Sequence, residues 1–256
     1  MNGETIFMIH GMMGGSWCWD NYKSFFTERG YRCITPVLRH HDTDPRAAPD
    51  PRLGTTGLLD YAADLEREIR RMDTAPVIMG HSMGGLLAQI LGSRGLAKAL
   101  VLLTPAAPHG IHCVSFSVFR SFAGLLARGS FWKKLFRISF RQAVYAMLHL
   151  LPPAEQRKVY DRLVYESGRA AFQIGFWFLD AEKASKVDHA RVRCPVLVVG
   201  GSCDRVTPAA VVKKVAEKYG SVSTYREYEN HAHWVLGEPG WQNIVADVAA
   251  WLEKVL

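Results

Sequence analysis

Short apolar runs alternate with longer segments of helical period along this chain, and that alternation restricts the fold more than any other feature. The runs that we expect to be strands are residues 5–9, 31–36, 76–80, 98–103, 195–200 and 221–227. Helical segments are expected at 19–28, 58–72, 85–93, 209–219 and 241–255. The strand runs are almost continuously apolar, which predicts strands buried on both faces of a mostly parallel sheet. The sequence therefore predicts a doubly wound α/β fold.

One long segment interrupts the alternation. Residues 109–190 separate two strands that a short crossover could join, and they are too many for a structureless loop. We expect an inserted helical lid here, with residues 1–108 and 191–256 forming the core. Large apolar side chains recur in it at helical spacings: Phe116, Phe119, Phe122, Leu126, Phe131, Trp132, Leu135, Phe136 and Phe140. They either pack the lid onto the sheet or line an apolar pocket.

The positive charge of the chain is concentrated in the same segment. The whole sequence has a net charge of +7, and residues 109–190 hold twelve basic and six acidic residues, net +6, which leaves +1 for the rest. No acidic residue occurs between Thr74 and Ala154, where eight basic ones do. This surface is either a solvated basic face or a docking surface for anionic lipid or an acidic substrate. The sequence has no recognisable nucleic-acid module, so nucleic acid is not an expected partner.

Compartment and metal binding can also be addressed from composition. No apolar stretch reaches the roughly 20 residues of a bilayer span, and the N-terminus lacks an export signal. The five cysteines are odd in number and form no Cys-x-x-Cys pair, which favours reduced thiols in the cytoplasm. His109 and His112 have no acid or cysteine at ligand spacing, so we expect no metal and place both at the mouth of a substrate pocket.

The strongest chemical motif is Gly80-His81-Ser82-Met83-Gly84, which follows an apolar strand and opens a helical segment. A tight turn from strand to helix forces its central residue to positive φ, and the flanking glycines leave room for the crowded backbone. Ser82 would then project from the sheet at a helix N-terminus, where N–H groups stabilise developing negative charge. We interpret Ser82 as a nucleophile.

A serine nucleophile also needs donors for an oxyanion. The loop after the first strand, His10-Gly11-Met12-Met13-Gly14-Gly15, is rich enough in glycine to turn its N–H groups inward. The backbone N–H groups of Met12 and Met83 are the expected oxyanion hole. His10 is interpreted as a structural residue of this loop that can also border the pocket.

An orienting acid and a base are expected at later strand ends. Asp204 lies in a short polar loop after the strand at 195–200, before a helix that begins with proline. His231 and His233 both follow the last strand, and periodicity does not choose between them.

Taken together, these segments resemble the α/β-hydrolase superfamily in the chain order Ser, Asp, His, over nearly the whole chain. The family pattern after the last strand is Gly-His-Trp or Gly-His-Phe followed by Glu-Pro. Here it aligns with 232–239, which read Ala-His-Trp-Val-Leu-Gly-Glu-Pro, so the resemblance implies His233 as the base and leaves His231 in reserve. Only four residues precede the first strand, so the resemblance implies a six-stranded sheet. His10-Gly11 with Ser16-Trp17-Cys18-Trp19 is similar to the short branch that contains methyl esterases and hydroxynitrile lyases.

The resemblance implies hydrolysis of small-molecule carboxylic esters through an acyl-enzyme, without metal or organic cofactor. Ser82 would attack, His233 would take the proton, Asp204 would fix the imidazole tautomer, and Met12 and Met83 would hold the oxyanion. The aromatic residues of the lid favour an apolar acyl or aryl substrate, and Trp17 and Trp234 are added to the expected pocket.

Other chemistries share these residues. The lyases of the short branch carry Lys after the catalytic His, where this chain has Trp234, and dehalogenases and epoxide hydrolases carry Asp where it has Ser82. Carbon–carbon bond hydrolases, thioesterases, lactonases and cofactor-free peroxidases or dioxygenases stay open. A receptor of the same fold that binds a ligand without converting it is the alternative outside enzymes.

Overall fold

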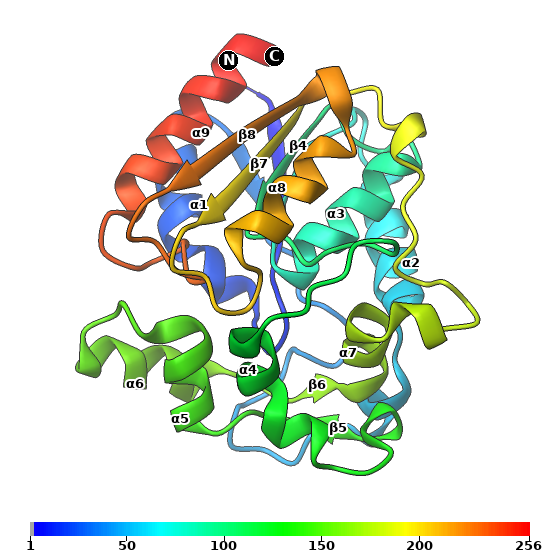
Figure 1. Cartoon of the computed structure of the whole chain (residues 1–256). Coiled ribbons are helices and arrows are strands. Elements are labelled where there is room, and N and C mark those ends of the chain that lie inside the picture. Colours follow the sequence, from blue (N-terminus) through cyan, green and yellow to red (C-terminus); the bar gives the residue numbers. More distant parts are fainter. Residues whose placement is uncertain (1–2) are drawn as a thin grey trace.

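A computed structural model describes residues 3–256. Its central sheet has six strands in the order β2-β1-β3-β4-β7-β8, and every neighbouring pair is parallel (Figure 1). The strands are β1 (Thr5–Ile9), β2 (Arg32–Ile34), β3 (Val77–His81), β4 (Ala99–Leu103), β7 (Val196–Gly201) and β8 (Ser223–Tyr228). The sequence prediction of a doubly wound α/β fold with a six-stranded sheet is confirmed.

Helices cover both faces of this sheet. On one face lie α1 (Asp20–Thr27) and α9 (Trp241–Val255), and on the other lie α2 (Leu58–Ile69), α3 (Met83–Ser93) and α8 (Ala209–Glu217) (Figure 1). Alternate side chains of one strand enter different cores, because successive residues of a strand point to opposite faces. In β1, Ile6 and Met8 pack with α1 and α9, whereas Phe7 and Ile9 pack with α2 and α3.

The two edge strands differ from the prediction that every strand is buried on both faces. All residues of β3, β4 and β7 are buried, but β2 and β8 contain no fully buried residue. An edge strand has a neighbour on one side only, so the helices cannot cover it completely. β8 accordingly carries the polar run Ser-Thr-Tyr-Arg-Glu-Tyr.

Between β4 and β7 the chain leaves the sheet and forms a separate layer below the carboxyl ends of the strands (Figure 1). Its helices are α4 (Phe116–Leu126), α5 (Phe140–Ala143), α6 (Pro153–Arg162) and α7 (Gly168–Gly175). In addition to the expected helices it contains an antiparallel pair, β5 (Leu135–Phe136) with β6 (Glu166–Ser167). We refer to this segment as the insertion.

The helical spacing predicted for the apolar side chains of the insertion holds only in part. Helix α4 ends at Leu126, and Phe131 and Trp132 belong to a 3-10 turn that leads into β5. Between the end of α4 and this 3-10 turn lies the segment Arg128-Gly129-Ser130, in which Ser130 has a φ of 55°. A chain that turns through the left-handed region cannot continue the helix.

Across residues 3–256, no helix combines the length and the hydropathy of a membrane span.

Candidate active site

Ser82 stands at the turn between β3 and α3 with a φ of 54° and a ψ of −120°. A side-chain-bearing residue rarely adopts positive φ, and here the glycines on either side make the turn fit. A Cβ at Gly80 would lie 2.2 Å from the carbonyl oxygen of Gly84, and one at Gly84 would lie 2.1 Å from that of Ile9. Only glycine is tolerated at both positions.

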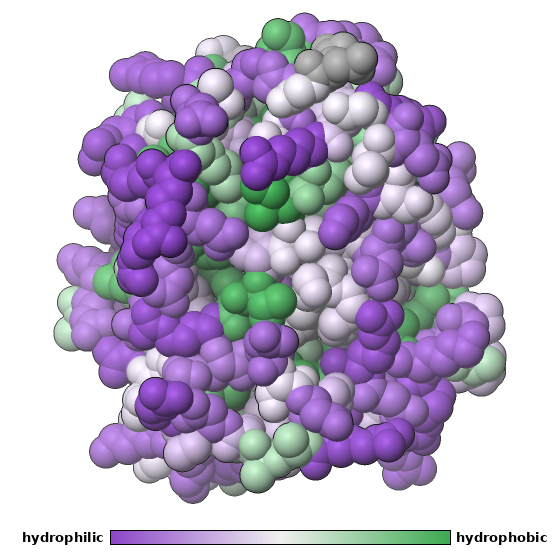
Figure 2. Space-filling view, turned by 180° about the vertical axis from the view of Figure 1, so that it is seen from behind, coloured by the Kyte–Doolittle hydropathy of each residue, from purple (hydrophilic) through white to green (hydrophobic). Residues whose placement is uncertain are grey.

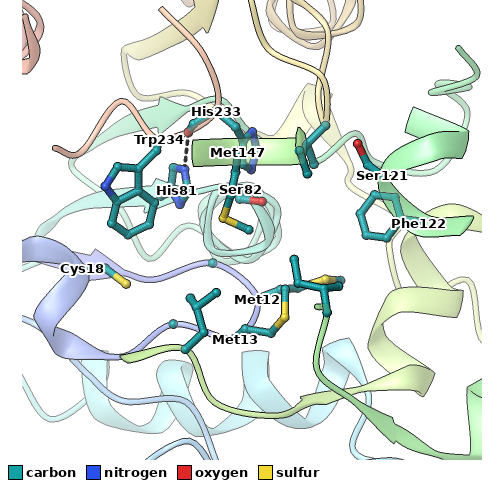
Figure 3. Close-up of a pocket in the computed structure, with 16 residues that line it drawn as sticks. Met12, Met13, Cys18, His81, Ser82, Ser121, Phe122, Met147, His233 and Trp234 are labelled. Carbon is teal, nitrogen blue, oxygen red and sulfur yellow. Dashed lines mark hydrogen bonds between the residues drawn. The ribbon is translucent and has the colours of Figure 1, made fainter. Parts of the chain in front are cut away.

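Hydrogen bonds on both sides hold the Ser82 backbone in this conformation. Its N–H donates to the carbonyl of Leu103 at 3.1 Å, and its carbonyl accepts from the N–H groups of Gly85, Leu86 and Ala106. The strained conformation of Ser82 is therefore held by the end of β4, the residues just after it and the first turn of α3. The side chain projects into a cavity above the sheet edge, beside Met147 and His233 (Figure 3).

Asp204 and His233 form the closest ionisable pair of the site. Their Oδ2 and Nδ1 atoms are 2.8 Å apart, and both side chains are buried. The other carboxylate oxygen accepts the N–H groups of Val206 at 2.7 Å and Thr207 at 2.9 Å. A carboxylate only accepts, so Nδ1 carries hydrogen and Nε2 is the free nitrogen that can take up a proton.

Two residues that the sequence analysis did not single out support this pair. Thr207 donates its hydroxyl to Asp204 Oδ2 at 2.8 Å, and the Thr207 hydroxyl oxygen also lies 3.3 Å from His233 Nδ1. His81 Nε2 donates to the backbone carbonyl of His233 at 2.8 Å, the bond drawn in Figure 3. Burial lowers the pKa of His81 to about 3, so its ring stays neutral. The only sequence signal for these residues is their position, with His81 directly before Ser82 and Thr207 three residues after Asp204.

Ser82 and His233 line the same cavity of about 40 Å³. Within the part of the chain that the structure describes, no hydrogen bond joins the Ser82 hydroxyl to the imidazole. Such bonds are often long in ligand-free enzymes and shorten when substrate binds. The three predicted residues, Ser82, Asp204 and His233, therefore meet at one edge of the sheet.

His231, the reserve base, has a different partner. Its Nδ1 lies 3.0 Å from Glu238 Oε1, which also accepts the N–H of Ala232 at 2.9 Å. Burial raises the pKa of Glu238 to about 7 and lowers the pKa of His231. The geometry pairs Asp204 with His233, whereas His231 anchors the loop that carries it.

The loop after β1 presses directly on the serine turn. A Cβ at Gly11 would lie 3.0 Å from the Ser82 Cβ and 3.1 Å from the His81 ring, so glycine permits this approach. Met12 lines the cavities on both sides of Ser82. The N–H of Met83 is the first of α3 and has no partner within the helix. Both predicted oxyanion donors thus belong to segments in contact with Ser82.

Two cavities meet at Ser82. The smaller one, about 40 Å³, is bordered by His233, Trp234 and Cys18. The larger one, about 350 Å³, is lined mainly by apolar side chains of the insertion, including Val118, Ile174 and Phe176. Four residues border both cavities: Met12, Ser82, Phe122 and Val206.

Of the remaining residues predicted for the pocket, two border a cavity and two pack behind residues that do. Trp234 borders the small cavity and His112 the large one. Trp17 lies behind Trp234, with ring centroids 5.7 Å apart, and His109 packs on Trp177 at 4.4 Å. Neither Trp17 nor His109 borders the two cavities at Ser82, where Trp234 and Trp177 form the wall in their place.

His10 also lies outside both cavities. Its Nδ1 donates to the Gly11 carbonyl at 2.8 Å and its Nε2 accepts the N–H of Leu38 at 3.1 Å. Burial lowers the pKa of His10 to about 3. Both ring nitrogens hold the loop after β1, as expected for a structural residue. His10 does not border either cavity at Ser82.

Residues 3–256 contain no group of three or more His, Cys, Asp or Glu side chains arranged to hold a metal ion.

Comparison with known proteins decides the family. The profile of the alpha/beta hydrolase family matches residues 6–243. The chain belongs to this family. Its structure resembles a methylesterase from Arabidopsis, with 12% identity over 98% of this chain and 99% of that chain at a TM-score of 0.73.

Two further structures are similar. A monoacylglycerol lipase from Paleococcus ferrophilus has 19% identity over 100% of this chain and 97% of its own, with a TM-score of 0.71. Methylketone synthase I from tomato, solved with 2-tridecanone, has 13% identity over 100% of both chains, with a TM-score of 0.74. At these identities the likeness concerns the fold alone, and the family membership supports a hydrolase.

Proposed function

We propose that this protein is a serine hydrolase that cleaves carboxylic esters of small molecules through an acyl-enzyme. The observation that carries the proposal is the 2.8 Å bond between Asp204 and His233 in the cavity that Ser82 enters. It leaves His233 Nε2 free on the same side as a hydroxyl that strained backbone geometry exposes.

In the proposed mechanism, Ser82 Oγ attacks the carbonyl carbon while His233 Nε2 takes the hydroxyl proton. The oxyanion of the tetrahedral intermediate is held by the N–H groups of Met12 and Met83. The bond to the leaving oxygen then breaks, and His233 returns the proton to that oxygen. Water attacks the acyl-enzyme with His233 again as base, which releases the acid and restores Ser82.

The two cavities at Ser82 indicate where the alcohol and the acyl group of the ester would bind. His233 must reach the leaving oxygen, and it borders the small cavity but not the large one. We therefore place the alcohol in the small cavity, of about 40 Å³, and the acyl group in the large cavity, of about 350 Å³. A medium-length alkyl or aryl acyl group on a small alcohol fits this division.

A serine-directed fluorophosphonate tests the proposal. We expect covalent labelling of the wild type at Ser82, located by peptide mass spectrometry, and no labelling of a folded Ser82→Ala variant. If folded wild type stays unlabelled and hydrolyses no ester, the receptor alternative is favoured. Turnover of thioesters or lactones in preference to esters would keep the nucleophile and change the substrate class.

We further propose that the insertion contacts anionic lipid surfaces. Exposed apolar side chains gather there, and Val114, Phe119 and Phe178 also line the large cavity, while Arg128 and Lys133 are exposed nearby in sequence. Seen from behind, hydrophobic side chains reach the surface in patches surrounded by hydrophilic ones (Figure 2). Binding to vesicles that contain phosphatidylglycerol should weaken as salt rises, and salt-independent or absent binding would leave a solvated face. We also propose a cytoplasmic location, which the five free cysteines support.

A further inference from the structure

Glu166, on β6 of the insertion, has a fully buried carboxylate beside the loop that carries Met12. Its Oε2 accepts the N–H of Met13 at 3.1 Å and lies 3.0 Å from His41 Nε2. Its Oε1 accepts the hydroxyl of Tyr61 at 2.9 Å and the N–H of Ser167 at 2.7 Å. The carboxylate thus joins the insertion to three separate segments of the core.

The partners of His41 identify the charge state of this pair. Its Nδ1 lies 3.0 Å from the Arg39 carbonyl and its Nε2 faces the Glu166 carboxylate, so both ring nitrogens meet acceptors. Only the doubly protonated ring donates from both nitrogens. Burial opposes this charge, but Glu166 raises the pKa of His41 and His41 lowers the pKa of Glu166. The result is a buried ion pair.

The insertion holds Met13 through both of its backbone polar groups. Glu166 accepts its N–H, and its carbonyl accepts the N–H of Val164 at 2.9 Å. Met13 has a φ of 60°, a conformation that is strained for a side-chain-bearing residue and persists only where neighbours enforce it. Met12, whose N–H is the proposed oxyanion donor, directly precedes this residue.

We propose that Glu166 is a positioning residue, which fixes the left-handed turn at Met13 and thereby aims the Met12 N–H at the oxyanion. The inference rests on the proposed function, since it assigns Glu166 a role in that reaction. It also explains why a charged pair is buried far from Ser82's own partners. The insertion is then both a wall of the substrate cavity and a part of the oxyanion machinery.

Glutamine at 166 has nearly the same shape but cannot satisfy the same partners. With its oxygen toward Met13, its NH₂ group would face the Ser167 N–H, which is also a donor. With the amide reversed, the NH₂ group would face the Met13 N–H. Without the carboxylate, His41 also loses the charge that stabilises its second proton. Either orientation brings two donors face to face beside the side chain and removes the charge that His41 depends on, so Glu166→Gln should weaken the contacts that hold the Met13 turn.

The experiment compares Glu166→Gln with Tyr61→Phe, which removes a donor from the other carboxylate oxygen and leaves the Met13 bond in place. For ester hydrolysis we expect Glu166→Gln to lower kcat roughly 10- to 100-fold with KM within threefold, because loss of a whole oxyanion donor costs 10²- to 10³-fold. Inhibition by an alkyl trifluoromethyl ketone, which places an oxyanion in the same hole, should weaken by a similar factor. Tyr61→Phe should stay within threefold of the wild type in kcat and inhibitor affinity.

The outcomes separate this inference from the proposed function. An inactive, unlabelled wild type would overturn the proposed function and this role with it. An active wild type whose folded Glu166→Gln variant keeps kcat and inhibitor affinity within threefold would overturn the role of Glu166 alone, as would an equal loss in Tyr61→Phe. If Glu166→Gln does not fold, Glu166→Asp replaces it under the same criteria, because it keeps the charge for His41 and is too short for the Met13 bond.

Discussion

Three buried histidines around Ser82 differ in what their ring nitrogens contact. His233 is bonded to a carboxylate that other donors already hold, His231 faces Glu238, and His81 donates to a backbone carbonyl. Of the three, only His233 both bonds to a carboxylate and lines the cavity that Ser82 enters. The hydrogen-bond partners of each ring, and not the residue type, therefore distinguish the proposed base from the two histidines that hold the surrounding loops.

A pair of matched substitutions tests this difference. His233→Gln should lower kcat for ester hydrolysis by roughly 10³-fold or more, because it removes the proposed base. His231→Gln should stay within about threefold, since a glutamine NH₂ group can still donate to Glu238. Steady-state kinetics with one methyl ester, followed by the acid released, measures both. The opposite ranking in two folded variants would exchange the roles of the histidines.

At the scale of elements, the insertion supplies most of the wall of the large cavity, whereas the proposed reacting groups all belong to the core. Helix α7 places Ala171 and Ile174 along the large cavity, and α4 faces them with Val118 and Phe122. The reacting groups instead come from loops at the carboxyl ends of β1, β3, β7 and β8, the edge where open α/β sheets bind ligands. Substrate length and catalytic rate should therefore be separable by mutation.

Ile174→Trp should shorten the acyl chain that the enzyme accepts. The larger ring would occupy part of the roughly 350 Å³ cavity, and Ile174 lies on α7 of the insertion, away in the chain from the loops that carry the proposed catalytic residues. We expect kcat/KM for methyl decanoate to fall about 10-fold, while that for methyl acetate stays within threefold. A chain-length series from acetate to decanoate measures this. Equal losses at every length, or a wild-type optimum at acetate, would contradict the placement of the acyl group.

At the scale of the whole molecule, burial of neutral histidines links stability to pH. Burial lowers the pKa of His10 and of His81 to about 3, against 6.5 when exposed. Between pH 3 and 6.5 each ring takes up a proton only when the protein unfolds. The contribution of the neutral ring to the free energy of unfolding is therefore complete above pH 6.5 and is lost as the pH falls towards 3. Glu238, with its pKa raised to about 7, acts in the opposite direction between about pH 4.5 and 7. The clearest measurement is therefore a difference between variants.

His10→Gln should remove one of these contributions. Its amide can keep both hydrogen bonds, to the Gly11 carbonyl and from the Leu38 N–H. Between pH 8 and pH 5 the variant should lose about 2 kcal/mol less free energy of unfolding than the wild type. Urea unfolding at the two pH values measures this, with His112→Gln at an exposed ring as the control. The same difference between wild type and variant at both pH values would contradict the assignment.

The sequence by itself determined the elements of the core and the candidates for chemistry. All six strands and five helices of the core lie within a few residues of the predicted ranges, because hydrophobic period reports locally which side chains are buried. The turn at Ser82 was equally visible, since glycines at fixed spacing allow only a small set of backbone conformations. Asp204 and the two histidines could be placed at strand ends, but their pairing could not.

Only the tertiary structure decided which distant groups meet. Asp204 bonds to His233 and not His231, and Glu166 reaches Tyr61 across 105 positions and Met13 across 153. The division of space around Ser82 into a small and a large cavity likewise depends on how the insertion packs over the sheet. Periodicity fixes which face of an element is buried, whereas a hydrogen bond depends on atomic positions that the register and packing of remote segments set. For that reason Thr207, His81, His41 and Glu166 carry no signal in the sequence comparable to that of Ser82.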